Sequence, residues 1–156
     1  MAEDSGVNMD GITLLAELTD KQRQAIAQQC VPLSFTAQQQ IIDQASDTTN
    51  VYFVLTGRMR VVNYSLLGRE VSLEDVDAGG HFAELAAIDG QPRSASVMAY
   101  SDAELASLSP LNFNKMIDKH RIVSRQVMMS LAGIVRRSTD RIMDLSALGA
   151  NNRVHA

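Results

Sequence analysis

The sequence predicts a mainly β protein, an antiparallel sandwich, jelly roll or barrel, with flanking helices at both ends of the chain. Two observations lead to this prediction. Apolar and polar residues alternate with a period of two through much of residues 31–109, as in half-buried strands. Helical patterns precede this region over 12–29 and follow it over 110–149. Strands and helices do not alternate, so a doubly wound parallel sheet is not expected.

Length and composition narrow the class of protein further. The 156 residues suffice for one domain with a substantial core, and 46% of them are apolar. A net charge of −4 argues against nucleic-acid binding by these residues themselves. No apolar run approaches the roughly 18 residues of a membrane span, and the acidic start does not resemble a signal peptide. A cytoplasmic location without membrane contact is therefore expected.

The N-terminal region is predicted to be a polar arm over 1–11 followed by a helix over 12–29. Thr19 and Gln22 have the spacing of a capping box. Ala25 and Ile26 are expected to face the core. Cys30 is the only cysteine, which excludes an intrachain disulfide and a cysteine-ligated cluster within one chain. Its apolar setting predicts a buried structural thiol.

The central region is predicted to hold several short strands. The continuous apolar run over 51–55 has strand length, and strict alternation follows over 58–61, 70–74 and 94–99. Glycine-containing turn pairs separate these segments, at 56–57, 67–68, 79–80 and 89–90.

Two helices are predicted after the strands. Ser109 suits a helix cap and Pro110 a first helical position, so a short helix begins there and reaches about Lys119. A long helix follows over 121–147 and carries residues spaced alternately by three and four, a heptad seam: Met128, Leu131, Val135, Ser138, Ile142 and Leu145. Such a seam predicts a parallel homodimer, and the alternative is packing on its own sandwich. The polar Ser138 either sets the register or meets a polar group.

The segment 79–97 contains the residues best suited to bind a ligand. A helix-like stretch over 83–87 interrupts the β pattern, and the free N–H groups at a helix start suit a phosphate. Arg93 follows across a turn and can bind two phosphate oxygens at once. Glu84 repels phosphate but can accept a hydrogen bond from a sugar hydroxyl. The pattern favours a sugar phosphate or nucleotide, and the alternative is a simple Glu84–Arg93 salt bridge.

This segment closely resembles the phosphate-binding cassette of cyclic-nucleotide-binding domains, whose pattern is Phe-Gly-Glu-Leu-Ala, a variable turn, and Pro-Arg-(Ser/Ala)-Ala. Here 82–86 is Phe-Ala-Glu-Leu-Ala and 92–95 is Pro-Arg-Ser-Ala. Gly57 and Gly68 also stand where that family has hairpin glycines. The Arg-Ser-Ala form most resembles the Crp/Fnr family of bacterial transcription regulators, which includes catabolite activator protein-like sensors.

The resemblance implies an antiparallel β-roll (a jelly roll, or double-stranded β-helix) followed by a long C-terminal dimerisation helix. The β-roll domain would cover 12–120, the dimerisation helix 121–147, and 148–156 would be a hinge towards a helix-turn-helix domain absent from this chain. The implied effector is cAMP. DNA would be bound only through the absent domain.

The resemblance also implies the residues that bind the ligand. Arg93 and Ser94 would bind the cyclic phosphate, assisted by backbone N–H groups around Ala83 and Leu85. Glu84 would take the ribose 2′-hydroxyl. One departure stands out, because the family's glycine in Phe-Gly-Glu is Ala83 here. A Cβ at this position is expected to crowd the phosphate or disfavour a positive φ, which bears on ligand affinity but not on the fold.

On the long helix, Ser138 would contact the base from its own subunit and Thr139 the base bound in the partner subunit. The alternative is that both hydroxyls bond back to helix carbonyls.

The expected function is a ligand-sensing, non-enzymatic domain of a Crp/Fnr-type regulator, with cAMP as effector and no metal. Alternatives are the same fold responding to another ligand or to none, the regulatory module of a kinase or channel, and a cupin-like metal-dependent enzyme. A cupin-like metal site needs two or three converging histidines. The chain has only His81, His120 and His155, which are not spaced to converge. A haem version would need an axial ligand such as His81, and an iron–sulfur version fails with one cysteine.

Overall fold

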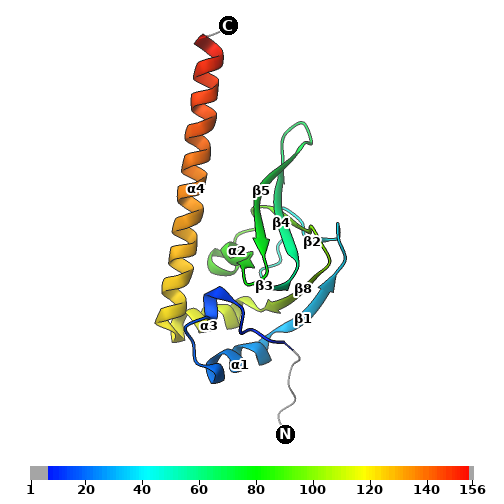
Figure 1. The fold of residues 1–156 in the computed structure, drawn as a ribbon, viewed down its shortest axis with the longest axis vertical. Coiled ribbons are helices and arrows are strands. Elements are labelled where there is room, and N and C mark those ends of the chain that lie inside the picture. Colours follow the sequence, from blue (N-terminus) through cyan, green and yellow to red (C-terminus); the bar gives the residue numbers. More distant parts are fainter. Residues whose placement is uncertain (1–6, 155–156) are drawn as a thin grey trace.

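The structure is a computed structural model that describes residues 7–154, with side chains as far as Ala147. It contains two four-stranded sheets, in which every strand pair is antiparallel. The sheets form a jelly roll, and the remaining elements are helical (Figure 1). The strands are β1 (Val31–Phe35), β2 (Gln40–Ile42), β3 (Val51–Thr56), β4 (Arg58–Tyr64), β5 (Glu70–Asp77), β6 (His81–Phe82), β7 (Ser96–Ala99) and β8 (Ala103–Leu108). The helices are η1 (Thr13–Leu15), α1 (Asp20–Gln29), α2 (Glu84–Asp89), α3 (Pro110–Lys119) and α4 (Arg121–Val154).

The sheet with strand order β1–β8–β3–β6 is buried on both faces in its centre. Phe53 and Val54 are neighbours on β3 and point to opposite faces, yet both are fully buried. Phe53 packs into a cluster with the helices, and Val54 packs into the space between the two sheets. This explains why 51–55 is a continuous apolar run rather than an alternating one. The predicted fold class is confirmed.

The N-terminal region differs from the prediction in two ways. The described part of the expected polar arm is not loose, because Val7 and Met9 are buried in the core. The expected helix over 12–29 is a short η1 turn followed by α1. The capping box explains the break: Thr19 accepts from the Gln22 N–H at 3.2 Å and Gln22 accepts from the Thr19 N–H at 2.9 Å, which holds Thr19 in an extended conformation.

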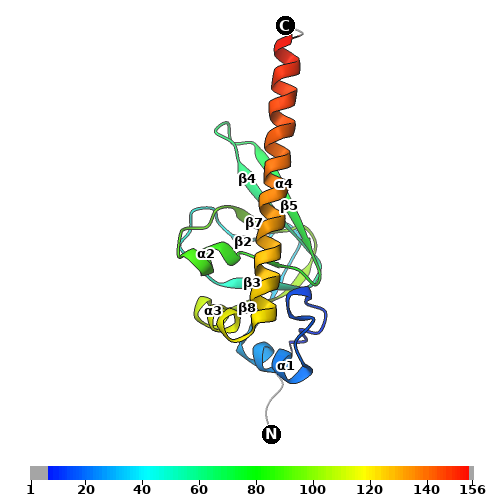
Figure 2. The same ribbon diagram turned by 90° about the vertical axis from the view of Figure 1, so that its left-hand side faces the viewer.

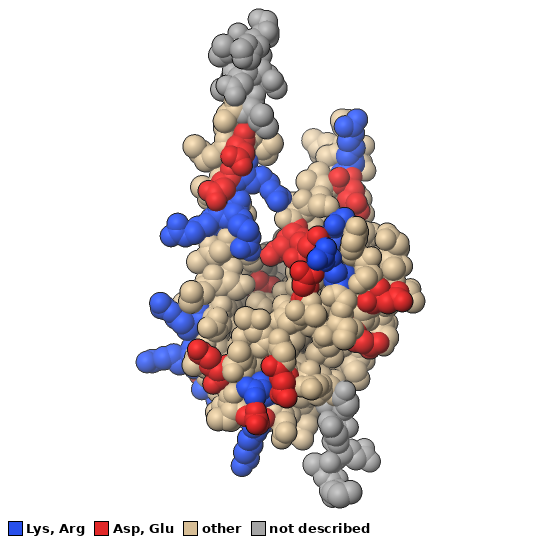
Figure 3. Space-filling model, in the orientation of Figure 1, with Lys and Arg blue, Asp and Glu red and all other residues tan. Residues whose placement is uncertain are grey.

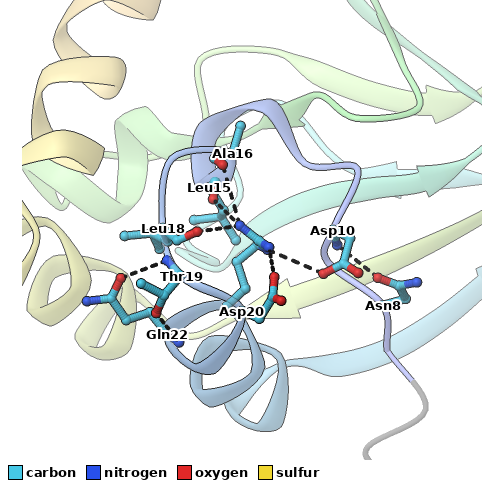
Figure 4. A network of polar contacts seen from close by, with 9 residues as sticks. Asn8, Asp10, Leu15, Ala16, Leu18, Thr19, Asp20 and Gln22 are labelled. Atoms are coloured by element: carbon cyan, nitrogen blue, oxygen red, sulfur yellow. Dashed lines mark hydrogen bonds and ion pairs between the residues drawn. The ribbon is translucent and has the colours of Figure 1, made fainter.

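The orientation of α1 is also corrected at one residue. Ile26 is buried as expected, but Ala25 is exposed and Ala27 takes the inner position. Arg23 on the same helix fixes the preceding segment, since its guanidinium donates to the carbonyls of Leu15, Ala16 and Leu18 and pairs with two aspartates (Figure 4). These bonds tie the segment between η1 and α1 to the first turn of α1.

Cys30, at the end of α1, is a buried free thiol, as predicted. Desolvation by burial raises the pKa of Cys30 to about 12 from an ordinary value of 9.0. Because the folded pKa is raised, the neutral thiol stabilises the fold fully below pH 9, and this contribution is lost as the pH rises from about 9 to about 12.

We therefore expect Cys30 to react with a disulfide reagent at pH 8 about a thousandfold more slowly in the native chain than in urea-unfolded chain, because little thiolate forms when it is folded. Absorbance of the released thiol follows both rates. Complete modification of native protein within the mixing time would contradict this expectation.

The hairpin glycines lie where the resemblance places them, with φ of +88° at Gly57 and +78° at Gly68. Gly57 has a second requirement: a Cβ there would lie 2.4 Å from the carbonyl oxygen of Asp102. The turn between β3 and β4 therefore admits only glycine without a backbone shift.

The long helix α4 lies along one side of the roll and extends beyond it (Figures 1 and 2). Its backbone continues to Val154, past the predicted end at 147, so the residues up to 154 of the expected hinge are helical. Gly149 costs only about 1 kcal/mol inside a helix and does not end it. The side chains after Ala147, and residues 155–156 of that hinge, lie outside the described part. None of the described helices is both long and apolar enough to cross a membrane.

The predicted heptad seam is mostly exposed in this single chain. Of its apolar members only Leu131 packs against the core, beside Val123 and Val127, which are buried but do not belong to the predicted seam. The apolar seam residues with more than half of their surface exposed are Met128, Val135, Ile142 and Leu145. Packing on its own sandwich therefore accounts for the first turns of α4 but not for the rest of the seam.

Candidate functional site

A cleft of about 330 Å³ lies between α4, the β4–β5 hairpin and the segment from His81 to Val97. Figure 3 shows it as a hollow between the long helix and the hairpin. Its volume lies in the range of small-molecule sites. All of the predicted ligand residues except Thr139 line it: Ala83, Glu84, Leu85, Arg93, Ser94 and Ser138.

Arg93 is the buried cation of this cleft, with only 5% of its surface exposed. Its guanidinium donates to the carbonyl of Ala83 at 2.9 Å, the carbonyl of Asn50 at 2.7 Å and the hydroxyl of Thr48 at 3.2 Å. Burial lowers the pKa of Arg93 from its ordinary value because it removes water from the cation, and Tyr52 opposes this shift. Among the described residues no carboxylate lies within ion-pairing distance of it.

The expected alternative, a salt bridge between Glu84 and Arg93, is therefore not formed. Glu84 is equally buried, and its carboxylate accepts no hydrogen bond from the described part of the chain. A buried cation held only by neutral oxygens and, in the same cleft, a carboxylate with unused acceptors leave both groups available to a ligand.

The loop between β2 and β3 fixes the backbone of Arg93. The Arg93 N–H donates to the Ser46 carbonyl, the Ala45 N–H donates to the Arg93 carbonyl, both at 2.9 Å, and Thr48 and Asn50 bond the side chain. The sequence does not predict the role of this loop. Its run of small polar residues over 43–50 indicates only a loop and carries no sign of the partner it holds.

Ala83 lies between β6 and α2 and has φ +72° and ψ +22°, a left-handed conformation. A Cβ at this position was expected to disfavour a positive φ, yet Ala83 adopts one. The surrounding hydrogen bonds hold its backbone in this conformation. Ala83 is the N-cap of α2 and supplies no side-chain cap, so the first N–H groups of α2 remain unpaired by side chains. Holding this left-handed conformation costs Ala83 about 1 kcal/mol in strain.

Replacing Ala83 with glycine should relieve this strain and raise the free energy of unfolding by about 0.5–1 kcal/mol, measured by urea denaturation. Ala87→Gly is the matched control, since Ala87 is buried inside the same helix and has helical backbone angles. It should destabilise by about 1 kcal/mol or more. Equal destabilisation by both changes would show that Ala83 is not strained.

The α4 side of the cleft holds hydroxyls and cations. Ser138 lines the cleft, whereas Thr139 does not and instead donates to the Val135 carbonyl at 2.9 Å, the back-bonded alternative. Arg137 pairs with Glu74 of β5 at 3.2 Å, and Arg141 donates to the Leu73 carbonyl at 3.1 Å. Both arginines, with Glu74 and Leu73, line the cleft. In the sequence these arginines are simply the charged neighbours of the seam residues Ser138 and Ile142.

His81 also lines the cleft, and its Nε2 is buried and has no hydrogen-bond partner among the described residues. No group of three or more His, Cys, Asp or Glu side chains within the described residues is placed to hold a metal ion.

The regions that match known proteins cover most of the chain. A family model for the cyclic nucleotide-binding domain matches residues 32–120. The chain is 31% identical over 104 residues to the cyclic AMP receptor protein of Thermus thermophilus, covering 67% of this chain and 48% of that protein. It is 25% identical over 121 residues to the cAMP-activated global transcriptional regulator CRP of Haemophilus influenzae, covering 77% and 54%. The chain thus spans about half the length of these curated relatives.

Solved structures share the fold. The catabolite activator protein of Thermus thermophilus aligns with a TM-score of 0.77 at 24% identity, covering 85% of this chain and 62% of that one. The regulatory domain of Toxoplasma gondii PKA with cAMP aligns with a TM-score of 0.69 at 20% identity, covering 80% and 47%. At these identities the likeness shows a shared jelly roll with flanking helices.

Proposed function

This chain belongs to the family of cyclic nucleotide-binding domains, and we propose on that premise that it is the cAMP-sensing and dimerisation domain of a cytoplasmic Crp/Fnr-type transcription regulator. The observation that carries the proposal is Arg93: a buried guanidinium in a cleft of ligand size, with no carboxylate partner among the described residues. A bound phosphate would neutralise it with two parallel hydrogen bonds.

The remaining groups fit the other parts of a cyclic nucleotide. Ser94 and the backbone N–H groups around Ala83 and Leu85 line the same end of the cleft and would share the cyclic phosphate. The unpaired carboxylate of Glu84 would accept from the ribose 2′-hydroxyl. With phosphate and ribose there, the base would lie towards α4, where Ser138 offers a hydroxyl. The named function of the relatives in binding cAMP supports adenine as the base.

Dimerisation would occur through α4. The exposed seam residues Val135, Ile142 and Leu145 form an apolar stripe on a helix that extends beyond the roll (Figure 2). A stripe of this spacing favours a parallel pair of helices. In such a pair Thr139, which does not line the cleft of its own chain, would reach the base bound in the partner subunit.

Sensing would then be a shift in the population of helix arrangements. Arg137 and Arg141 connect α4 to β5 across the cleft. A ligand bound between α4 and β5 would therefore contact both the roll and the dimerisation helix. A ligand that binds one arrangement of the paired helices more tightly stabilises that arrangement. In this proposal the DNA-binding part of the regulator lies outside residues 1–156 and is reoriented by the helices.

Thermal denaturation of the chain with cAMP, cGMP and 5′-AMP tests the proposal. At about 100 times Kd, cAMP should raise Tm by roughly 5–10 °C, and 5′-AMP should have little effect because it lacks the cyclic phosphate. A shift with none of the three at millimolar concentration would overturn the proposal and leave a domain of this fold that responds to another ligand or to none.

A further inference from the structure

We infer that two buried serines, Ser96 and Ser107, position the guanidinium of Arg93 for a phosphate by anchoring the segment that holds it. Four polar or charged side chains are buried in the described part of the chain: Glu84, Arg93, Ser96 and Ser107. The first two are the proposed ligand groups, whereas neither serine lines the cleft. A buried hydroxyl is expected to serve a hydrogen bond, and both serines accept one from the same segment. The part of the inference that concerns binding rests on the proposed function.

The two serines fix the two ends of the segment 44–50, between β2 and β3. At its start the Gln44 N–H donates to the Ser96 hydroxyl of β7 at 2.9 Å. At its end the Asn50 side-chain amide donates to the Ser107 hydroxyl of β8 at 3.0 Å. β7 and β8 are inner strands of different sheets, so the segment is tied to the centre of each sheet although it has no regular secondary structure of its own.

Between these two anchors the segment supplies acceptors for Arg93. The Arg93 Nε–H donates to the Thr48 hydroxyl at 3.2 Å, and Nη2 donates to the Asn50 carbonyl at 2.7 Å. A third bond runs from Nη1 to the Ala83 carbonyl at 2.9 Å. Because a guanidinium has five N–H donors, these bonds leave one N–H on each terminal nitrogen unused within the described residues. These two N–H groups can donate to two oxygens of one phosphate.

The anchors matter because the acceptors around Arg93 are all neutral. No carboxylate of the described residues holds this guanidinium by an ion pair, so its position depends on how firmly the segment 44–50 is held. A cation that is already ordered loses less side-chain freedom when a ligand binds, which raises the affinity. Ser96 and Ser107 are therefore positioning residues, which act on the phosphate through this segment.

Nuclear magnetic resonance of the chain without ligand tests the positioning of Arg93. Its Nε–H signal, assigned by its loss in Arg93→Ala, should exchange with water slowly in the wild type. Exchange should be at least about fivefold faster in Ser96→Ala and in Ser107→Ala, because the loosened segment releases the guanidinium more often. Neither serine hydroxyl is hydrogen-bonded to Arg93 itself. An unchanged exchange rate in both variants would overturn the inference.

Calorimetric titration with cAMP tests the consequence for binding. Ser107→Ala and Asn50→Ala should each weaken binding by about fivefold, the effect of one neutral hydrogen bond. The double variant should bind as well as either single variant, because both changes break the same bond. Losses that multiply in the double variant would show that Ser107 supports the fold in general and does not act through Asn50.

Ser101→Ala is the matched control. Ser101 lies in the turn between β7 and β8, and its hydroxyl accepts from the Arg58 N–H at 3.0 Å, but it neither lines the cleft nor bonds to the segment 44–50. It should leave the exchange rate and the affinity unchanged. If the wild type binds no cAMP, the proposed function fails, and the exchange rates measured without ligand still decide whether the serines position Arg93.

Discussion

Replacing Arg93 with alanine is expected to weaken cAMP binding by at least about a hundredfold, the largest effect of any single change in this domain. The guanidinium is buried and has no carboxylate partner in the described part of the chain, so the cyclic phosphate would be its only neutralising group. The Kd follows from calorimetric or fluorescence titration. The uncharged side chain would also leave the carbonyls of Asn50 and Ala83 without a donor, at a cost of about 1–3 kcal/mol in stability.

Two further variants separate ligand binding from folding. Ser94 is exposed at the cleft and holds no other element, so Ser94→Ala should fold normally and still lose about fivefold in affinity. Arg58→Ala removes an exposed arginine outside the cleft and should bind as the wild type does. An Arg93→Ala chain that keeps its native circular dichroism spectrum and its affinity for cAMP would exclude Arg93 as the phosphate ligand.

The second large effect concerns the seam of α4. Changing both Val135 and Ile142 to glutamate should weaken self-association by at least about a hundredfold, because the pairing of two helices would bury carboxylates against each other. Both side chains are more than 60% exposed in the single chain, so the stability of the protomer should change little. Sedimentation equilibrium measures the association, and thermal denaturation at low concentration measures the protomer.

Met143→Glu is the control for this change. Met143 is 65% exposed and adjacent to Ile142, but it lies one position outside the seam and should face solvent in a helix pair. It should leave self-association unchanged. A double-glutamate variant that associates as strongly as the wild type would show that the dimer, if formed, uses another surface.

The elements best predicted from sequence are those set by local patterns. The antiparallel β class follows from period-two alternation, and the start of α3 follows from the cap at Ser109. The errors have the same local origin. A helical pattern over 12–29 did not show that the cap at Thr19 forces an extended residue, and alternation could not show that Val7 and Met9 reach the core.

The resemblance predicted the cassette residues of the candidate site and Ser138 on the long helix, which line the cleft. The partners that hold Arg93 lie far away in the chain, with Thr48 and Asn50 separated from it by 45 and 43 residues. Glu74 and Arg137 are 63 residues apart. No spacing rule connects such pairs, because the roll brings them together only when the sheets and α4 have packed. The same reason explains why Arg137 resembles an ordinary flanking charge in the sequence.

A calorimetric titration of the wild-type chain with cAMP tests the central claim most directly. We predict saturable heat with one cAMP bound per protomer and a Kd of about a micromolar or lower, lost in Arg93→Ala. The absence of any saturable heat up to millimolar cAMP would contradict the account, whatever the fold.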